Sequence, residues 1–517
     1  WSATFGKNTD ALTAFVPTLK VAPRSQCNGS FEQDKRNFTF FSSSDSISYD
    51  GYLLSQINYV TANGQNGRAD LNVDIRRAQI NDTLGFSNIK LNADAGSNVL
   101  NSKLSWDNLS KEKNQGTIES KLTFESKQSM KFEISNASFY VNDSLWQVDP
   151  TNFVRKDSSV ILVRNLMFRS GTQSVGVNGT ISKRPTDHLD IALNKFNLSS
   201  LNYLTKSEGV TVSGYLSGQT VLSDLYNAPK FTGNSEFTSL FINKEKIGDG
   251  TVDAFWEQDK QAVYVNGKFN KGVIDDQTGK VINNISFAGY YYPKNKENSL
   301  DIGVDLYKMP LAMIQPLLAD FCSMVVGHVA GHMDVKGNFS KPLMNGKLAV
   351  SIGKIKVDYL GIELAHKVEQ PIFIEENSFF FDDFKISDNQ RDTCNIYGHL
   401  YHDNFKKFQF DMDFAFEHFQ VLNTTAADNE DYFGKVYATG FMNIFGFVDE
   451  VISIDIKART DKVIRNGQPI SSDFNIPMST TSEVGESEYI KFEQFANDTV
   501  RKDTSVKIAR QMFNNNG

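Results

Sequence analysis

The chain has 517 residues, with 53 Lys and Arg against 61 Asp and Glu, so its formal net charge is -8. This balance argues against nucleic acid as a partner, because no basic stripe or tail is present to neutralise phosphates. The chain contains 40 Phe, yet its mean hydropathy is only -0.36. Such a mixture is typical of strands whose successive side chains face opposite ways.

The chain does not begin with Met, and we expect it to be a fragment or a processed product. Its three cysteines, Cys27, Cys322 and Cys394, lie far apart and form no CxxC pair. This spacing predicts neither a disulfide framework nor a zinc site. We interpret the three residues as buried or unreactive thiols.

Five segments alternate apolar and polar residues with a period of two, which predicts strands with one apolar and one solvated face. In chain order they are residues 71–75, 189–193, 300–306, 408–416 and 452–456. The clearest is "FQFDMDFAF" at 408–416, in which Phe and Met alternate with Gln, Asp and Ala.

Three short helices are predicted, each a few residues after an alternating strand. They begin at Leu198, Pro310 and Val421, which lie 112 and 111 residues apart. A Gly-rich strand pair follows each of them. The recurrence predicts an internal repeat of about 110 residues and an elongated body.

This period divides the chain into repeated parts. We assign residues 1–50 to an unplaced segment, 51–188 to a first β part, and 189–299 and 300–409 to two repeat units. Residues 410–480 form a partial unit, and 481–517 form the end of the piece.

The longest apolar run, residues 309–331, is interrupted by Pro310, Pro316, Asp320 and His328. These interruptions argue against a membrane span. We expect a short helix followed by a strand, with any membrane anchor outside this chain.

The alternation changes its phase between residues 348 and 357. The apolar residues Leu348, Val350 and Ile352 occupy even positions, and Ile355 and Val357 occupy odd positions. A shift of one residue would turn every later side chain to the other face, so we predict a bulge or corner at Gly353. Pro342 and Gly346 are read as a second corner.

Few residues offer chemistry. His328, His332 and Asp334 share the polar face of one predicted strand, where a metal site is conceivable. We favour a solvent-facing strand and assign no metal. Two adjacent acid pairs, Asp382–Asp383 and Glu375–Glu376, could serve a glycosidase, but neighbours on a strand point to opposite faces.

The motif "FEHF" at 416–419 stands alone, and the sequence has no nucleophile elbow, Walker loop or dinucleotide fingerprint in a strand–turn–helix context. We therefore assign no catalytic residue and no cofactor, and expect a protein that is not an enzyme.

Several stretches together resemble the TamB family, the translocation and assembly module proteins among the AsmA-like bridge-type lipid transfer proteins, in its Bacteroidota form. They are "SWDNLSKEKNQGTI" (105–118), "LDIALNKFNLSSLNYL" (189–204), "GHVAGHMDVKGNFSKPLMNGKLAV" (327–350), "GKVYATGFMNIFG" (434–446), "ISIDIKARTDKV" (452–463) and "FNIPMS" (474–479). The resemblance covers roughly residues 50–495.

The resemblance implies a mainly β fold, in which an elongated repetitive sheet is bent into a U-shaped trough (a β-taco) with a few short helices. It implies an interior segment of a bridge across the periplasm of a Gram-negative (diderm) bacterium that carries phospholipid between inner and outer membranes. Its partners would be phospholipid, an Omp85-type outer-membrane barrel reached through a C-terminal region beyond this piece, and the inner membrane reached through a missing N-terminal anchor.

Other interpretations stay open. The sheet edge could pair with client strands in a scaffold for outer-membrane protein assembly. The apolar faces could meet in an ordinary sandwich, or the chain could be a parallel β-helix enzyme acting on polysaccharide. The helices and the period argue against an outer-membrane barrel.

If the apolar face carries lipid, its lining residues are the apolar members of the alternating segments. They are Leu189, Ile191, Leu193, Leu300, Ile302, Val304, Leu306, Val329, Met333, Val335, Leu348, Val350, Ile352, Phe408, Phe410, Met412, Phe414, Phe416, Ile452, Ile454 and Ile456.

Overall fold

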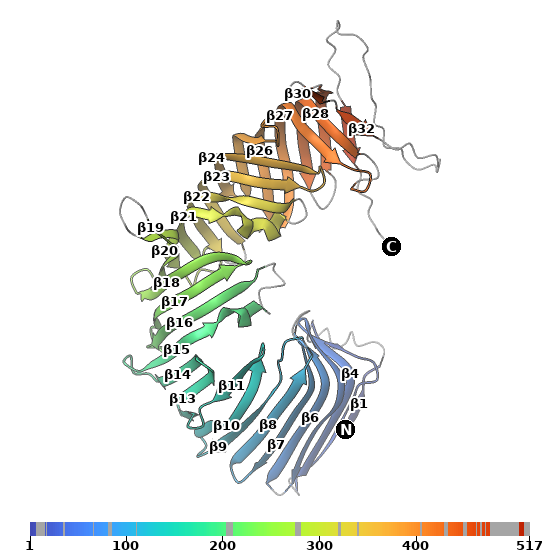
Figure 1. Ribbon diagram of the computed structural model, residues 1–517. Coiled ribbons are helices and arrows are strands. Elements are labelled where there is room, and N and C mark those ends of the chain that lie inside the picture. The colour runs from blue at the N-terminus through green and yellow to red at the C-terminus, as the bar shows by residue number, and fades with distance from the viewer. Residues whose placement is uncertain are drawn as a thin grey trace. The chain divides into compact units, whose positions relative to one another are not determined.

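The computed structural model is almost entirely β-structure (Figure 1). It describes residues 1–6, 16, 18–34, 37–65, 67–80, 85–109, 111–202, 210–274, 281–318, 322–338, 341–403, 406–428, 433–447, 452–461, 463–465, 468–470, 472–475 and 506–510. The chain divides into two compact units, Trp1–Leu240 with Thr251–Trp256, and Phe241–Gly250 with Glu257–Gly517.

Unit 1 is an antiparallel sheet in which most strands pair with the next strand along the chain. Its strands are β1 (Ser2–Thr4), β2 (Lys20–Val21), β3 (Gln26–Glu32), β4 (Asn37–Tyr49), β5 (Tyr52–Gln65), β6 (Arg68–Gln79), β7 (Gly85–Gly96), β8 (Val99–Asn108), β9 (Gly116–Phe124), β10 (Ser129–Val141), β11 (Ser144–Val148), β12 (Phe153–Asp157), β13 (Val160–Ser170), β14 (Gln173–Ile181), β15 (His188–Asn197) and β16 (Val212–Ser223). The strands β11 and β12 both pair with β10 and with β13, so together they fill one position of the sheet.

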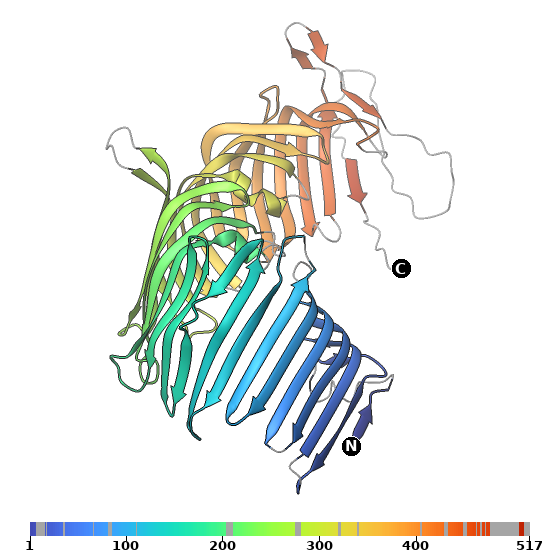
Figure 2. The same cartoon turned by 60° about the horizontal axis from the view of Figure 1, so that its bottom comes forward.

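Strands β17 (Lys230–Ile242) and β18 (Glu245–Glu257) contain the boundary between the units. Unit 2 continues with β19 (Ala262–Ile274), β20 (Val281–Tyr291), β21 (Leu300–Pro310), β22 (Cys322–Asn338), β23 (Lys341–Val357), β24 (Ile362–Glu376), β25 (Ser378–Ser387), β26 (Thr393–Asp403), β27 (Lys406–Thr424), β28 (Phe433–Phe447), β29 (Ile452–Thr460), β32 (Asp473–Asn475) and β33 (Val506–Arg510), and with a separate hairpin of β30 (Val463–Arg465) and β31 (Gln468–Ile470). Figure 2 shows that the sheet within each unit is curved.

The prediction of a mainly β chain with a long repetitive sheet is confirmed. All five alternating segments lie in strands, namely β6, β15, β21, β27 and β29. The apolar run at 309–331 forms a short helix followed by a strand, as expected. Among the residues that the structure describes, no helix has both the length and the apolar character needed to cross a membrane.

Two of the three predicted helices are present as short 3₁₀ segments, η1 (Leu198–Leu201) and η3 (Leu311–Leu318). The third prediction was wrong. Leu422 pairs with Val436 and Thr424 with Gly434, so the segment from Val421 continues β27. Its ladder bonds to β28 outweigh a weak local helical preference. Residues 203–208, 319–321 and 429–430 of the predicted helices lie outside the described residues.

A recurring β-bulge sets the direction of the side chains. Each copy is a four-residue segment, or tetrad, with apolar residues at its first and fourth positions and two other residues between them. The first and fourth residues, three positions apart, pair with residues that are only two positions apart on the next strand, so the tetrad contains one extra residue. The bulge tetrads are residues 163–166, 193–196, 306–309, 381–384 and 416–419. In a regular strand, residues three positions apart point to opposite faces. Because the bulge inserts one extra residue, the first and fourth side chains of the tetrad stay on one face.

Every bulge tetrad has the same backbone signature. Its third residue is in the left-handed region, with φ between 46° and 54°. Its first residue pairs with a glycine on the next strand; these glycines are Gly179, Gly218, Gly331, Gly398 and Gly440. A Cβ atom on any of these glycines would lie 2.2 to 2.4 Å from a carbonyl oxygen of the following strand. At these five bulges, a side chain on the opposing residue would therefore overlap the backbone of the following strand.

The bulge at Gly353 is also confirmed. Val326 pairs with Lys354 and Gly327 with Ile352, so Gly353 is the extra residue. The reading of Gly346 as a corner was wrong: it lies inside β23, where a Cβ would be 2.7 Å from the Cα of Met333. Glycine here allows close approach of the strands rather than a bend. Pro342 lies near the start of β23, opposite Gly337.

One buried apolar cluster lies in unit 2, on the side of the sheet where the bulges occur. Its members include Leu311 from η3, Val325, Val350, Phe384 and Phe416. The helix η3 packs on β22 and brings Leu311 to the cluster. This core lies beside the bulges, whereas other apolar side chains of the same face, such as Ile302, Val304 and Met333, are only half-buried.

Candidate functional site: the apolar face

The register of unit 2 aligns apolar residues of successive strands into rows. One row can be followed through the strand pairings from β19 to β29, and it contains only apolar residues and glycine. In order it comprises Gly267, Phe287, Val304, Met333, Gly346, Ile374, Phe379, Leu400, Phe410, Gly446 and Ile452. Ten spacings of about 4.8 Å make this row about 48 Å long.

The opposite face has a different composition. The adjacent positions on β21, β22 and β27 are Asp305, His332, Asp411 and Asp413, all of them exposed. The face that carries the row is apolar because alternate side chains of each strand point to it and are apolar. The bulge tetrads keep the apolar side chains on this face along the long strands. We call it the apolar face of unit 2.

The residues expected to line an apolar groove lie on these faces, with two degrees of burial. Six of them are buried: Val350, Ile352, Met412 and Phe416 belong to the core of unit 2, and Leu300 and Phe408 are buried outside it. The remaining unit 2 positions are half-buried and stay accessible; they are Ile302, Val304, Leu306, Val329, Met333, Val335, Leu348, Phe410, Phe414, Ile452, Ile454 and Ile456.

Unit 1 has an apolar face of its own. Leu189, Ile191 and Leu193 are half-buried there, and Ile191 pairs with Val177 and Leu193 with Val175. A row that sequence reasoning missed crosses six strands of this unit, through Val60, Val73, Leu91, Leu104, Ile118 and Ala137. The alternation in these strands was visible, but their small and aliphatic side chains gave a weaker signal than Phe.

Further members of the unit 2 row were also missed, on β24 to β26. Phe379, Phe380 and Phe381 are consecutive, so hydropathy alone does not reveal which of them faces which way. The pairing of Phe379 with Leu400 places it in the apolar row, and Phe380 pairs with His399 in the neighbouring row of the other face.

The opposite face of unit 1 is a polar ladder. Asn63 donates to Asp70 (3.2 Å), and Asn92 donates to Asn72 (2.7 Å). Farther along the sheet, the Nζ atom of Lys103 lies 2.9 Å from a carboxylate oxygen of Glu119, and this ion pair lowers the pKa of Glu119. Such cross-strand pairs stabilise a solvated sheet surface.

The histidines considered as metal ligands lie on the polar face of unit 2. His332 Nδ1 is 2.7 Å from Asp305 Oδ1, and this hydrogen bond raises the pKa of His332. His328 instead contacts Glu369, at 3.1 Å. In the part of the chain that the structure describes, no three His, Cys, Asp or Glu side chains gather as metal ligands would.

Burial raises the pKa of two of the thiols. It raises the pKa of Cys322 to about 11 and that of Cys394, inside the core, to about 12. Of the acid pairs, Glu375 and Glu376 are exposed at the end of β24. Asp382 and Asp383 occupy the middle of a bulge tetrad, where Asp383 accepts a hydrogen bond from the Tyr397 hydroxyl at 2.7 Å.

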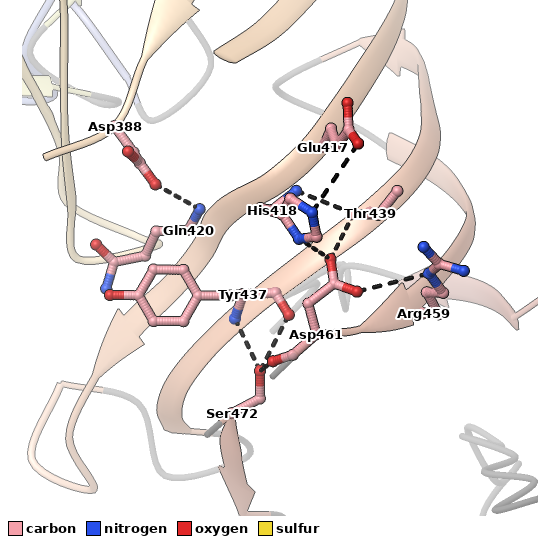
Figure 3. A network of polar contacts seen from close by, with 9 residues as sticks. All are labelled: Asp388, Glu417, His418, Gln420, Tyr437, Thr439, Arg459, Asp461 and Ser472. Atoms are coloured by element: carbon pink, nitrogen blue, oxygen red, sulfur yellow. Dashed lines mark hydrogen bonds and ion pairs between the residues drawn. The ribbon is translucent and has the colours of Figure 1, made fainter. Parts of the chain in front are cut away.

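The tetrad at 416–419, which looked isolated in the sequence, is held by the polar network of Figure 3. The backbone N–H of His418 donates to Thr439 Oγ1 (2.9 Å), and Thr439 in turn donates to Asp461. The carboxylate of Asp461 also lies 3.1 Å from His418 Nδ1 and 3.5 Å from Arg459 Nε. These contacts fix the left-handed residue of the bulge.

No protein-family model, curated protein or solved structure matches this chain.

Proposed function

We propose that the apolar faces bind the acyl chains of phospholipid and conduct them along the sheet, in an interior segment of a TamB-like bridge. The observation that carries the proposal is the unbroken row of apolar residues and glycine from β19 to β29 in unit 2. The sequence resemblance described above points to the same function.

The energetics favour such a surface. Exposing a methylene to water costs about 0.8 kcal/mol, so the two chains of a phospholipid, with about 30 methylenes, cost about 25 kcal/mol. An apolar surface removes much of this cost without any catalytic group. The hydrocarbon core of a bilayer, two acyl chains thick, is about 30 Å. The row in unit 2, at about 48 Å, is longer than one acyl chain.

Glycine within the row has a role in this proposal. Gly346 and Gly446 alternate with large side chains of the neighbouring strands. Together they leave a surface of varied depth rather than a flat layer of side chains. Flexible acyl chains adapt to such a surface, because dispersion contacts are non-directional.

The proposal places the chain in the periplasm of a diderm bacterium, with an Omp85-type barrel and the inner membrane as partners reached through other parts of the protein. The competing function is a scaffold that pairs client strands at its edge. The two differ in what co-purifies: phospholipid in the first case, and extended peptide in the second.

The test uses native mass spectrometry of the purified protein, before and after extraction with detergent, on two variants of neighbouring residues. Phe414 lies on the apolar face, whereas Ala415 lies on the other, opposite Asn395. We expect Phe414→Asp to lose bound phospholipid and Ala415→Asp to keep it. Lipid retained equally by both folded variants, or bound peptide without lipid, argues against the proposal.

A further inference from the structure

The face of unit 2 opposite the apolar row carries an aromatic surface of its own. Three phenylalanines of β28 point away from the core and are strongly exposed: Phe441 by 67%, Phe445 by 50% and Phe447 by 43%. Because exposed Phe is unfavourable in water, a contiguous group of this kind marks an interaction surface. The strand lies between β27 and β29 of unit 2 (Figure 1).

The aromatic surface continues across β25 and β26. The ring centroids of Phe380 and His399 are 4.7 Å apart, and those of His399 and Tyr401 are 5.2 Å apart, both pairs stacked. Through β27, Tyr401 and Phe447 flank Gln409, and His399 and Phe445 flank Asp411. We name this surface the aromatic band; it comprises Phe380, His399, Tyr401, Phe441, Phe445 and Phe447.

Carboxylates lie between the rings. Asp411 and Asp413 are exposed on β27. Asp411 lies between His399 and Phe445, and Asp413 lies between Tyr397 and Asn443. Asp413 accepts a hydrogen bond from the Asn443 side chain at 2.9 Å. Within the described residues, neither carboxylate lies in an ion pair with Lys, Arg or His. Asp455 and Lys457 border the band on β29.

A lysine side chain of the same unit already lies over an aromatic ring at one end of this surface. The Nζ atom of Lys347 lies 5.2 Å from the ring centroid of Phe373, whose ring is 6.0 Å from that of Phe380. Ring faces attract ammonium and guanidinium groups, and neighbouring carboxylates add to this attraction. Anionic ligands would instead be repelled by the carboxylates of Asp411 and Asp413.

We propose that the aromatic band is a docking surface for a basic, amphipathic segment of another protein, whose Lys or Arg side chains lie over the rings and pair with Asp411 and Asp413. Its apolar side chains would cover Phe441 and Phe445, which have the composition typical of the centre of a protein interface. This inference concerns the face opposite the acyl-chain row, so it stands or falls independently of lipid binding.

The test is fluorescence anisotropy of the purified chain with a labelled amphipathic peptide that combines Lys and Leu. The matched probe is the same peptide with each Lys replaced by Glu. We expect the Lys peptide to bind with an affinity that falls as salt rises, and the Glu peptide not to bind.

Two variants locate the site. Phe441→Ser with Phe445→Ser removes the apolar centre, and Asp411→Asn with Asp413→Asn removes the charge while keeping side-chain shape. Each double variant should weaken binding of the Lys peptide by about tenfold or more. Phe124→Ser, at a 45% exposed Phe of β9, should leave binding unchanged.

Circular dichroism and thermal unfolding establish that each variant is folded, and the Asp→Asn pair provides the test if the Phe pair is not. Failure of the Lys peptide to bind the unaltered chain, or equal binding to the unaltered chain and the folded variants, overturns the proposal. Tighter binding of an N-acetylglucosamine oligomer or of phosphatidylglycerol vesicles, abolished by the same variants, overturns it in favour of a glycan or a membrane.

Discussion

Substitution of Gly398 by Ala tests the physical basis of the bulge tetrads. Gly398 has φ of 109° and lies opposite Phe381, the first residue of a tetrad. A Cβ there would lie 2.2 Å from the carbonyl oxygen of Asp411 and 3.0 Å from the Cα of Met412. Backbone strain of this kind costs about 1–3 kcal/mol, and the overlap with rigid backbone adds to it. We expect a loss of about 3 kcal/mol or more in the free energy of unfolding.

The assay is thermal unfolding followed by circular dichroism, with Gly353→Ala as the matched control in the same unit. At Gly353 the nearest atom to a new Cβ is the carbonyl oxygen of Val326, at 3.4 Å, which is an ordinary contact. For a unit of this size, 3 kcal/mol corresponds to a fall of about 6–12 °C in Tm. If Gly398→Ala and Gly353→Ala unfold within about 2 °C of each other, the steric reasoning is wrong.

Three further predictions concern individual side chains. The thiol of Cys394 should react with a thiol reagent at pH 8 only when the protein is unfolded, because burial raises its pKa to about 12; rapid labelling of folded protein would contradict this. Burial lowers the pKa of His402 in the folded chain. Below about pH 6.5 the unfolded chain therefore binds a proton at this residue more readily than the folded chain does, and the free energy of unfolding should fall as the pH drops. Denaturant titrations at pH 7 and 5.5 should show a smaller fall for His402→Leu than for the unaltered chain, and equal falls would refute the assignment. Asp461→Ala removes the acceptor shared by Thr439 and His418 and should cost about 1–3 kcal/mol of unfolding free energy, whereas an unchanged Tm would show that the network does not hold the bulge.

The strands were predictable because a period of two appears directly in the hydropathy pattern. The alternation at 300–306 and 408–416 identified both the strands and their apolar sides, and the register agrees with that parity. The phase change at Gly353 was also readable, since apolar residues changed from even to odd positions within one strand. Local patterns of this kind depend only on neighbouring residues of the same strand.

The recurring bulges were not recognised, although their signal is present in the sequence. "LNKF", "LYKM" and "FEHF" begin at 193, 306 and 416, so their spacing is close to the repeat of about 110 residues. Read one at a time, such tetrads resemble short breaks in a strand. Their meaning depends on a glycine in the next strand, and that pairing is a tertiary contact. The prediction of a helix from Val421 was wrong for the same reason, because residues 422–424 pair with β28, which is also a tertiary contact.

The central claim is that one face of the sheet, and not the other, contacts acyl chains. It is tested most directly by placing a photocrosslinking amino acid at each position from 409 to 414 and exposing the protein to radiolabelled phospholipid vesicles. The account predicts lipid crosslinks from positions 410, 412 and 414, strongest at the half-buried Phe410 and Phe414, with little from 409, 411 and 413. Equal crosslinking from both sets of positions would contradict it.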